Sequence, residues 1–213
     1  MTSVLAGHTR PVSAVACFSL ADGTPRVVSG ADDRTLRVWD PVTGRGLMTL
    51  AGHRKWVRAV ASFTLADGSV RIVSGSDDRT LRVWSPIQVG EALVEMTGHT
   101  DYVRAVTCFN RAEDGAPRVV SGSSDETIRV WNPETGTPLC CFEGHERGVV
   151  SVQMLRIKHI FGGALMRIVS GSYDKTVRVW DPSGSPEALM VLEGHHSGSV
   201  RSVATFQLKS GPR

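Results

Sequence analysis

The stretch RIVSGSDDRTLRVWS at residues 71–85 decides the fold, because nearly the same stretch occurs four times along the chain. The other copies are RVVSGADDRTLRVWD at 26–40, RVVSGSSDETIRVWN at 118–132 and RIVSGSYDKTVRVWD at 167–181. Each copy follows a Gly-His dipeptide, and the glycines of these dipeptides stand at positions 7, 52, 98, 144 and 194. The resulting spacings of 45, 46, 46 and 50 residues indicate tandem repeats of one structural unit.

Each repeat contains four β-forming segments and no segment with helical periodicity. In the second repeat these segments are residues 57–63, 71–76, 80–84 and 92–96, and the Asp67-Gly68 turn suits a hairpin between the first two. One such unit cannot bury both of its faces alone, so neighbouring units must stack, and radial stacking gives a propeller. The sequence predicts an all-β propeller of four-stranded antiparallel blades in a single domain over residues 1–213. Its four full repeats are 3–40, 46–85, 91–132 and 138–181, and a partial fifth is 187–208.

The motif Gly-His, followed by Ser-Gly-x-x-Asp-x-Thr-x-Arg-Val-Trp-Asp, resembles the WD40 (WD-repeat) family from residue 3 to about residue 208. In that family a His, a Ser or Thr, an Asp and a Trp form a hydrogen-bonded structural tetrad in each blade. The resemblance implies these roles for four sets of residues. They are His8, Ser29, Asp33 and Trp39; His53, Ser74, Asp78 and Trp84; His99, Ser121, Asp125 and Trp131; and His145, Ser170, Asp174 and Trp180.

Ser, His and Asp also form the catalytic triad of hydrolases, which is the alternative interpretation of these residues. A triad needs one asymmetric site with an oxyanion hole, whereas this trio occurs once in each of four repeats and always with a Trp. The sequence also contains no G-x-S-x-G, G-x-x-x-x-G-K-[ST] or G-x-G-x-x-G motif. We therefore expect no catalytic residues and a protein that is not an enzyme.

The resemblance further implies that proteins or peptides bind on the face that carries the Gly-His loops and the turns between second and third strands. Three positions in each repeat would supply the contacts. They are Pro11, Ser13 and Asp32; Trp56, Arg58 and Asp77; Tyr102, Arg104 and Ser124; Gly148, Val150 and Tyr173; and, in the partial repeat, Ser199 and Arg201.

Trp56 is the one Trp of the chain that the tetrads do not use, and both Tyr residues fall at contact positions. Because Trp, Tyr and Arg are enriched at binding hot spots, we expect a partner-binding surface. It comprises Trp56, Arg58, Asp77, Tyr102, Arg104, Ser124 and Tyr173. The two arginines would suit an acidic or phosphorylated peptide. The alternative is that the aromatic side chains only cover neighbouring loops.

Composition narrows the remaining classes of function. The net charge is +3 with both signs interspersed, which does not indicate a nucleic-acid partner. No apolar run reaches membrane-spanning length, and we expect neither a membrane span nor an export signal. The four cysteines lack zinc-ligand spacing, so we expect no metal, no cofactor and a reducing compartment, cytoplasmic or nuclear. Cys17 and Cys108 occupy equivalent positions and are predicted to be buried.

The ends and the fourth repeat depart from the pattern. Residues 3–6 are predicted to form an outermost strand and residues 199–208 an innermost strand, which cannot pair with each other. Three explanations stay open: a piece of a longer propeller, such as a signalling or ubiquitin-ligase adaptor; completion by a second chain; or a four-bladed ring. Exposed terminal blades leave unpaired strand edges that invite aggregation, which favours a piece of a longer propeller, and such edges would also permit self-association.

In the fourth repeat, residues 153–164 predict a longer loop or a bulge between the first two strands.

Overall fold

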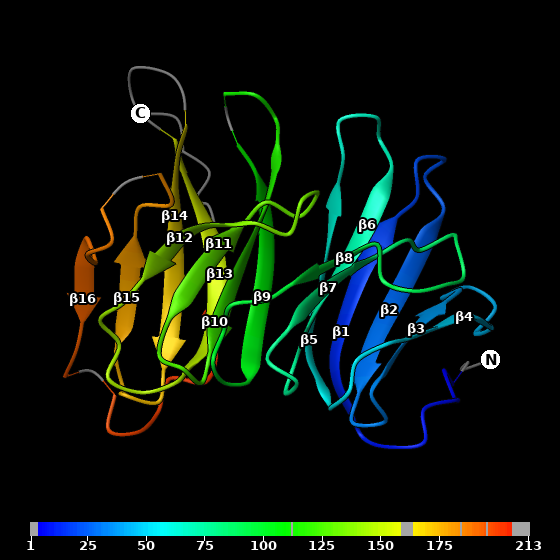
Figure 1. The fold of residues 1–213 in the computed structure, drawn as a ribbon, viewed down its shortest axis with the longest axis horizontal. Helices are drawn as coiled ribbons and strands as arrows, with labels where there is room; N and C mark the ends of the chain where they lie inside the picture. The colour runs from blue at the N-terminus through cyan, green and yellow to red at the C-terminus, as the bar shows by residue number, and fades with distance from the viewer. Residues whose placement is uncertain (1–3, 112, 159–163, 184, 195, 206–213) are drawn as a thin grey trace, which may run out of the picture.

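The computed structural model describes residues 4–111, 113–158, 164–183, 185–194 and 196–205, in which strands are present and helices are not. The strands form four antiparallel sheets in chain order, here called blades 1 to 4 (Figure 1). Blade 1 contains β1 (Val12–Ser19), β2 (Pro25–Ala31), β3 (Thr35–Trp39) and β4 (Gly46–Ala51). Blade 2 contains β5 (Val57–Thr64), β6 (Val70–Ser76), β7 (Leu81–Trp84) and β8 (Val94–Met96). Blade 3 contains β9 (Val103–Asn110), β10 (Pro117–Ser123), β11 (Ile128–Trp131) and β12 (Pro138–Phe142). Blade 4 contains β13 (Val149–Lys158), β14 (Ala164–Ser172), β15 (Val177–Trp180) and β16 (Met190–Leu192).

The predicted all-β class and four-stranded blades are confirmed, and the strands of blade 2 agree with the predicted segments to within two residues. The hairpin between β5 and β6 closes at the predicted turn, where Gly68 has a φ of 82°. There the Asp67 carboxylate accepts a hydrogen bond of 2.8 Å from the backbone N–H of Ser69. An L side chain rarely adopts such a φ, which is why glycine is suited to this position.

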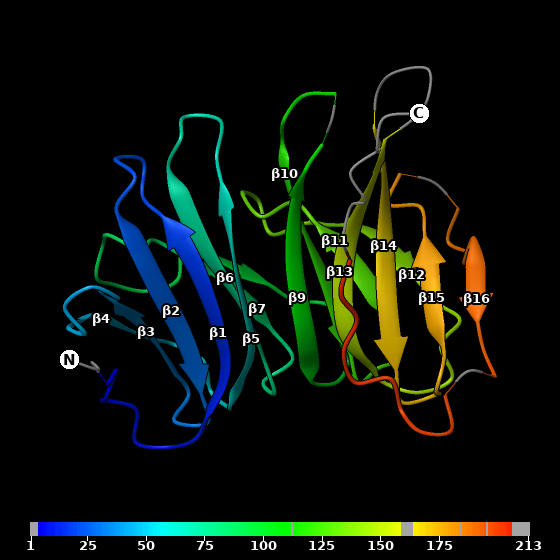
Figure 2. The ribbon, with the colours of Figure 1, turned by 180° about the vertical axis from the view of Figure 1, so that it is seen from behind.

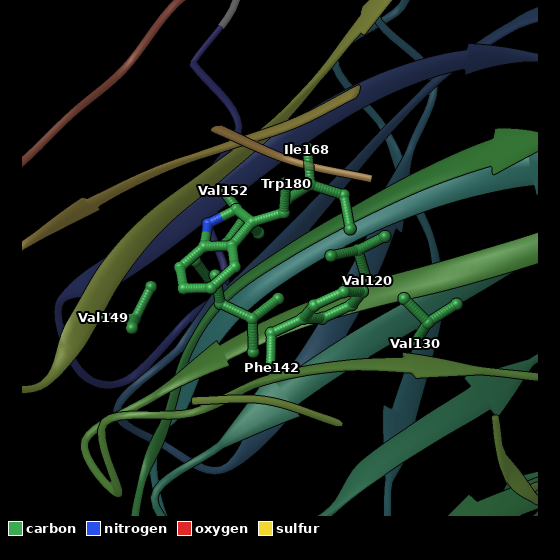
Figure 3. Close-up of a cluster of buried hydrophobic side chains, with 9 residues drawn as sticks. Val120, Val130, Phe142, Val149, Val152, Ile168 and Trp180 are labelled. Atoms are coloured by element: carbon green, nitrogen blue, oxygen red, sulfur yellow. The ribbon is translucent and has the colours of Figure 1, made fainter. Parts of the chain in front are cut away.

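The blades stack through their faces, and buried apolar side chains fill each border between neighbouring blades. Figure 3 shows the border between blades 3 and 4, where Val120 and Phe142 of blade 3 pack with Ile168 and Trp180 of blade 4. The Phe142 and Trp180 rings lie 5.7 Å apart between centroids. Equivalent clusters occupy the borders between blades 1 and 2 and between blades 2 and 3. Three borders with the same construction hold the four blades in one row.

The row of blades is open. Blade 1 and blade 4 lie at opposite ends of it in both views (Figures 1 and 2), so the four-bladed ring does not match the structure. On β1, Cys17 is exposed, and the prediction that it is buried was wrong. Cys17 stands on the face of blade 1 that no other described blade covers, whereas its equivalent in blade 3, Cys108, is shielded between two blades.

The predicted terminal strands were wrong for the residues that the structure describes. Residues 4–6 and 199–205 form no strand, because a strand needs a ladder of backbone hydrogen bonds to a neighbouring strand and neither segment is part of such a ladder. The second segment nevertheless lies against blade 4: Val200 is buried, and its backbone N–H donates to the carbonyl of Ser172 over 3.0 Å. Residues 3 and 206–208 of the two predictions lie outside the described residues.

The extra residues of the fourth repeat lengthen a hairpin. β13 and β14 have 10 and 9 residues, against 8 and 7 for β5 and β6. They pair without interruption from Ser151 with Gly171 to Lys158 with Ala164. A bulge does precede this ladder, but blades 1 to 3 have the same bulge. The insertion therefore extends the two strands, and residues 159–163 of the predicted loop lie outside the described residues.

Candidate functional site

The four polar residues of blade 2 form one chain of hydrogen bonds from the blade interior to its loop. The Trp84 indole N–H donates to Ser74 Oγ over 2.9 Å, and Ser74 Oγ lies 2.7 Å from His53 Nε2. His53 Nδ1 lies 2.8 Å from Asp78 Oδ2. Because a carboxylate can only accept, the imidazole donates through Nδ1, and Nε2 accepts from the serine hydroxyl. Each of these four side chains thereby has a hydrogen-bond partner.

The same chain recurs in all four blades, with His-to-Asp distances of 2.6–2.8 Å and His-to-Ser distances of 2.7 Å. The Trp-to-Ser distances are 2.8–2.9 Å. The Trp side chains are at most 2% exposed. The structure therefore brings together each of the four sets of residues that the sequence grouped.

Each Asp also accepts hydrogen bonds from its own turn. Asp174 receives the backbone N–H of Thr176 over 2.8 Å and the Thr176 hydroxyl over 2.7 Å. Burial acts to raise the pKa of Asp174, but the hydrogen bonds from His145 and Thr176 outweigh it and lower the pKa to about 2. Burial also lowers the pKa of His145, although Asp174 opposes this shift. At neutral pH blade 4 therefore holds a neutral imidazole against an ionised carboxylate.

A β-bulge at the start of the first strand of each blade, β1, β5, β9 and β13, places one side chain on the Gly-His face. We define this face by loops 7–11, 52–56, 98–102 and 144–148 and by turns 32–34, 77–79, 124–126 and 173–175. In β5, Val57 pairs with Ser76 and Ala59 pairs with Gly75, so Arg58 is the extra residue. The bulged residues of the other blades are Ser13, Arg104 and Val150. A bulge re-aims its side chain, which explains why these positions face the turns of their blades.

The two bulged arginines join neighbouring blades through ion pairs. Arg58 Nε lies 3.0 Å from each carboxylate oxygen of Asp77, and Arg58 Nη1 lies 3.4 Å from Asp32 Oδ1 of blade 1. Arg104 Nε donates to Ser124 Oγ over 2.9 Å, and Arg104 Nη1 lies 3.9 Å from Asp77 Oδ1. These guanidinium groups are therefore held in place by the protein's own carboxylates and hydroxyl.

An aromatic ring lies against each of these arginines. The Arg58 guanidinium lies 4.5 Å from the centroid of the Trp56 ring, and the Arg104 guanidinium lies 5.0 Å from the centroid of the Tyr102 ring. Trp56 is 44% exposed, whereas the tetrad Trp side chains are buried. Stacking on Arg58 fixes the orientation of a large apolar ring that still faces solvent.

A hollow of about 660 Å³ opens on the Gly-His face beside these side chains. It lies at the border of blades 1 and 2, and Trp56, Asp77 and Tyr102 of the predicted surface line it. Ser124 and Tyr173 lie in the turns of blades 3 and 4, and the backbone N–H of Tyr173 donates to the carbonyl of Gly148 over 3.1 Å. The predicted surface thus divides into a part at the hollow and a part further along the row.

The sequence interpretation missed the basic residues of the hollow, which are Arg10, Arg34, Arg54 and Lys55. All four are exposed at the ends of loops and turns. A comparison of the repeats could have predicted these residues, because the equivalent loop and turn positions vary in charge while the strands are nearly identical. Variable loop positions on a constant scaffold are where function is expected to lie.

Within the described ranges, no group of three or more His, Cys, Asp or Glu side chains is placed to hold a metal ion. That same part of the chain contains no helix that is long and apolar enough to cross a membrane.

Comparison with known proteins agrees with this geometry. The family model "WD domain, G-beta repeat" (WD40) matches residues 1–40, 44–85, 90–132 and 136–181, which is more than half of the chain. A curated relative, Mitochondrial division protein 1 of Schizosaccharomyces pombe, is 49% identical over 49 residues. The aligned part covers 23% of this chain and only 7% of that protein. With four matched repeats and one hydrogen-bonded tetrad in each blade, the chain belongs to the WD40 repeat family.

Proposed function

We propose that the chain is a non-enzymatic platform that binds a protein or peptide on its Gly-His face, centred on Trp56, Arg58, Tyr102 and Arg104. WD40 repeats indicate a scaffold for protein interactions. The observation that carries the proposal is the exposed Trp56 ring, which stacks on an arginine that two carboxylates hold. A preorganised aromatic side chain loses little conformational freedom on binding, which is the property of a hot spot.

The geometry of the tetrads argues against hydrolysis as the alternative. Ser74 Oγ is buried, accepts from Trp84 and lies within hydrogen-bond distance of His53. A nucleophilic serine needs an open path to a substrate carbonyl and donors for the oxyanion, whereas this hydroxyl lies between two packed side chains, Trp84 and His53. Four equivalent sets support a structural role for these residues.

The experiment compares the partners that the wild-type protein and a Trp56→Ala/Arg58→Ala double variant recover from a cell extract. We expect the double variant to lose the specific partners of the wild-type protein, because it removes both the aromatic ring and the group that orients it. Ile87→Ala is the matched control, since Ile87 is 71% exposed but lies in a loop between β7 and β8. Unchanged partners in the double variant, at equal thermal stability, would refute the proposed surface.

We further propose that the protein resides in the cytoplasm or the nucleus. All four cysteines, Cys17, Cys108, Cys140 and Cys141, are free in the structure, which supports a reducing compartment such as the cytoplasm or the nucleus.

A further inference from the structure

The Gly-His face is not uniformly charged, and its positive charge is concentrated at one border between blades. At the border of blades 1 and 2, the turn carries Arg34 and the facing loop carries Arg54 and Lys55. The equivalent residues are Arg79, Thr100 and Asp101 at the next border, and Glu126, Glu146 and Arg147 at the last. A scaffold role would recur in every repeat, as the tetrads do. The concentration of charge therefore points to a ligand that binds at one border.

Three arginines of this border are free to bind a ligand, whereas the Lys55 ammonium lies 5.6 Å from the centroid of the Tyr102 ring. The guanidinium groups of Arg10, Arg34 and Arg54 are exposed and have no hydrogen bond or ion pair within the described part of the chain. Arg58 differs from them, since Asp32 and Asp77 already neutralise it. An anionic group would consequently meet its partners at the rim of the hollow, and the arginine beneath Trp56 would serve to fix the ring.

These arginines and two aromatic side chains line the same hollow. Arg10, Arg34 and Arg54 line the same space of about 660 Å³ as Trp56 and Tyr102. The carboxylates of Asp32, Asp33 and Asp77 line it too, but Asp32 and Asp77 already pair with Arg58, and Asp33 with His8. Arginine forms bidentate, charge-assisted hydrogen bonds with phosphate, and an exposed ring packs against an apolar side chain. The lining thus offers a place for a phosphate group and, beside it, a place for an apolar residue of the same ligand.

We propose that the hollow between blades 1 and 2 binds a peptide that carries a phosphorylated serine or threonine. Arg10, Arg34 and Arg54 bind the phosphate, and Trp56 packs against a flanking apolar residue. This inference rests on the proposed function, because it assigns the ligand class and the anion-binding residues of the same face.

The charges beyond the hollow favour a peptide over a nucleic acid. On the Gly-His face of blades 3 and 4, the acidic residues Asp101, Glu126 and Glu146 stand beside Arg147 and Lys175, so the positive charge of the hollow does not continue there. A nucleic-acid strand carries a phosphate about every 3.4 Å, so a strand that continued past the hollow would meet these carboxylates. A single phosphorylated side chain places its charge at the hollow alone.

The test uses a synthetic peptide library with a central phosphoserine or phosphothreonine and the same library without phosphate. The immobilised protein selects from both, and fluorescence anisotropy then gives the affinity of the most enriched peptide with and without its phosphate. The variants are Arg34→Glu and Arg54→Glu. Arg79→Glu is the matched control, because Arg79 occupies the same turn position as Arg34 but lies outside the lining of the hollow. Glutamate suits this turn, since Glu126 adopts a φ of 73° at the equivalent position.

We expect phosphorylation to raise the affinity by about tenfold or more, as a charge-assisted site should. Arg34→Glu and Arg54→Glu should remove this gain, and Arg79→Glu should retain it. Equal affinity for the two forms of the peptide, or an equal loss in Arg79→Glu, would overturn the inference. Stronger binding of a single-stranded oligonucleotide than of the phosphopeptide would also overturn it, in favour of a nucleic acid.

The same measurements separate this inference from the proposed function. If Trp56→Ala/Arg58→Ala abolishes binding of unphosphorylated peptides and Arg34→Glu changes nothing, the platform stands and the phosphate site is wrong. If the double variant retains phosphate-dependent binding that Arg34→Glu removes, the phosphate site stands and the surface centred on Trp56 is wrong.

Discussion

Single hydroxyl groups join the polar residues of each blade. Ser74 accepts from the Trp84 indole and lies within hydrogen-bond distance of His53, and its side chain is buried. A hydroxyl can accept and donate through one oxygen atom, whereas an amide needs two atoms to do so and a carboxylate only accepts. The net contribution of one such bond is about 1 kcal/mol, but a buried partner left without it costs about 1–3 kcal/mol.

We therefore predict that Ser74→Ala lowers the free energy of unfolding by roughly 2–4 kcal/mol, because the Trp84 N–H and the His53 imidazole both lose a buried partner. Urea denaturation followed by circular dichroism measures the change. Ser69→Ala in the same blade is the control, since its hydroxyl bonds Asp67 in the exposed hairpin. That change should cost about 0.5 kcal/mol or less. Equal losses in the two variants would contradict the prediction.

Titration of the tetrad in blade 4 should make the protein less stable in acid. Burial lowers the pKa of His145 below 6.5, and the pKa of Asp174 falls from 3.8 to about 2 despite its burial. In both cases the unfolded chain binds a proton more readily, so stability is lost as the pH falls. The loss should begin below about pH 6.5 with His145 and continue towards pH 2 with Asp174.

Urea midpoints measured from about pH 8 down to about pH 2 test this prediction. The midpoint should be level above the ordinary pKa of histidine and should fall below it. Asp174→Asn removes one titrating carboxylate and should make the decline below about pH 4 shallower. A midpoint that rises as the pH is lowered from about 6.5 would contradict the assigned directions.

At the scale of the strand, the glycine of each Ser-Gly pair sets how closely two blades approach. A Cβ atom on Gly75 of β6 would lie 2.6 Å from Val103 Cγ1 and 3.0 Å from Val106 Cγ2 of β9. The equivalent glycines, Gly30, Gly122 and Gly171, each face two valines of the following segment in the same way. The branched valine side chain is stiff, so it cannot move aside without shifting its strand.

We predict that Gly75→Ala destabilises the protein by about 1–3 kcal/mol, the usual cost of overpacking a core. The Gly75→Ala/Val103→Ala double variant should lose less than the sum of the single changes, because the second change removes the atoms that clash. Thermal unfolding of the four proteins in this cycle measures the coupling. Strictly additive losses would show that Gly75 acts through its own strand and not through the border between blades.

At the scale of the whole molecule, the two ends of the row present faces that are buried elsewhere. Val12 and Val15 of β1 are 50% and 59% exposed, whereas the equivalent Val57 and Val60 of β5 are 0% and 9% exposed. At the other end, Leu192 of β16 is exposed, although the residue at the same place in β12, Phe142, is buried. Apolar sheet faces of this kind associate in water.

We predict that the purified chain self-associates and that Val12→Lys/Val15→Lys reduces the association, because charged side chains on an exposed sheet face oppose packing. Light scattering at increasing protein concentration gives the mean mass of each protein. Val42→Lys/Val89→Lys is the control, since both valines are exposed in loops between strands. A wild-type protein that stays monomeric at all concentrations would contradict this expectation.

The repeats alone determined the all-β class, the four blades and the grouping of His, Ser, Asp and Trp, because these features depend on local pattern and on spacing within one repeat. The segments 4–6 and 199–205 show the limit of that reasoning, since a β-forming sequence becomes a strand only beside a partner. The exposure of Cys17 shows the same limit, because its burial depends on a neighbouring blade.

Tertiary structure decided the chemistry of the Gly-His face. From the sequence, Arg58 and Arg104 were expected to receive an anionic partner, yet the bulges and the stacking of blades bring Asp32 and Asp77 against Arg58 and place Asp77 near Arg104. The arginines left free are those of loops and turns that meet across a border, such as Arg34 and Arg54. Distances between blades are not encoded in the period of a repeat, so pairing of charges across them emerged only in three dimensions.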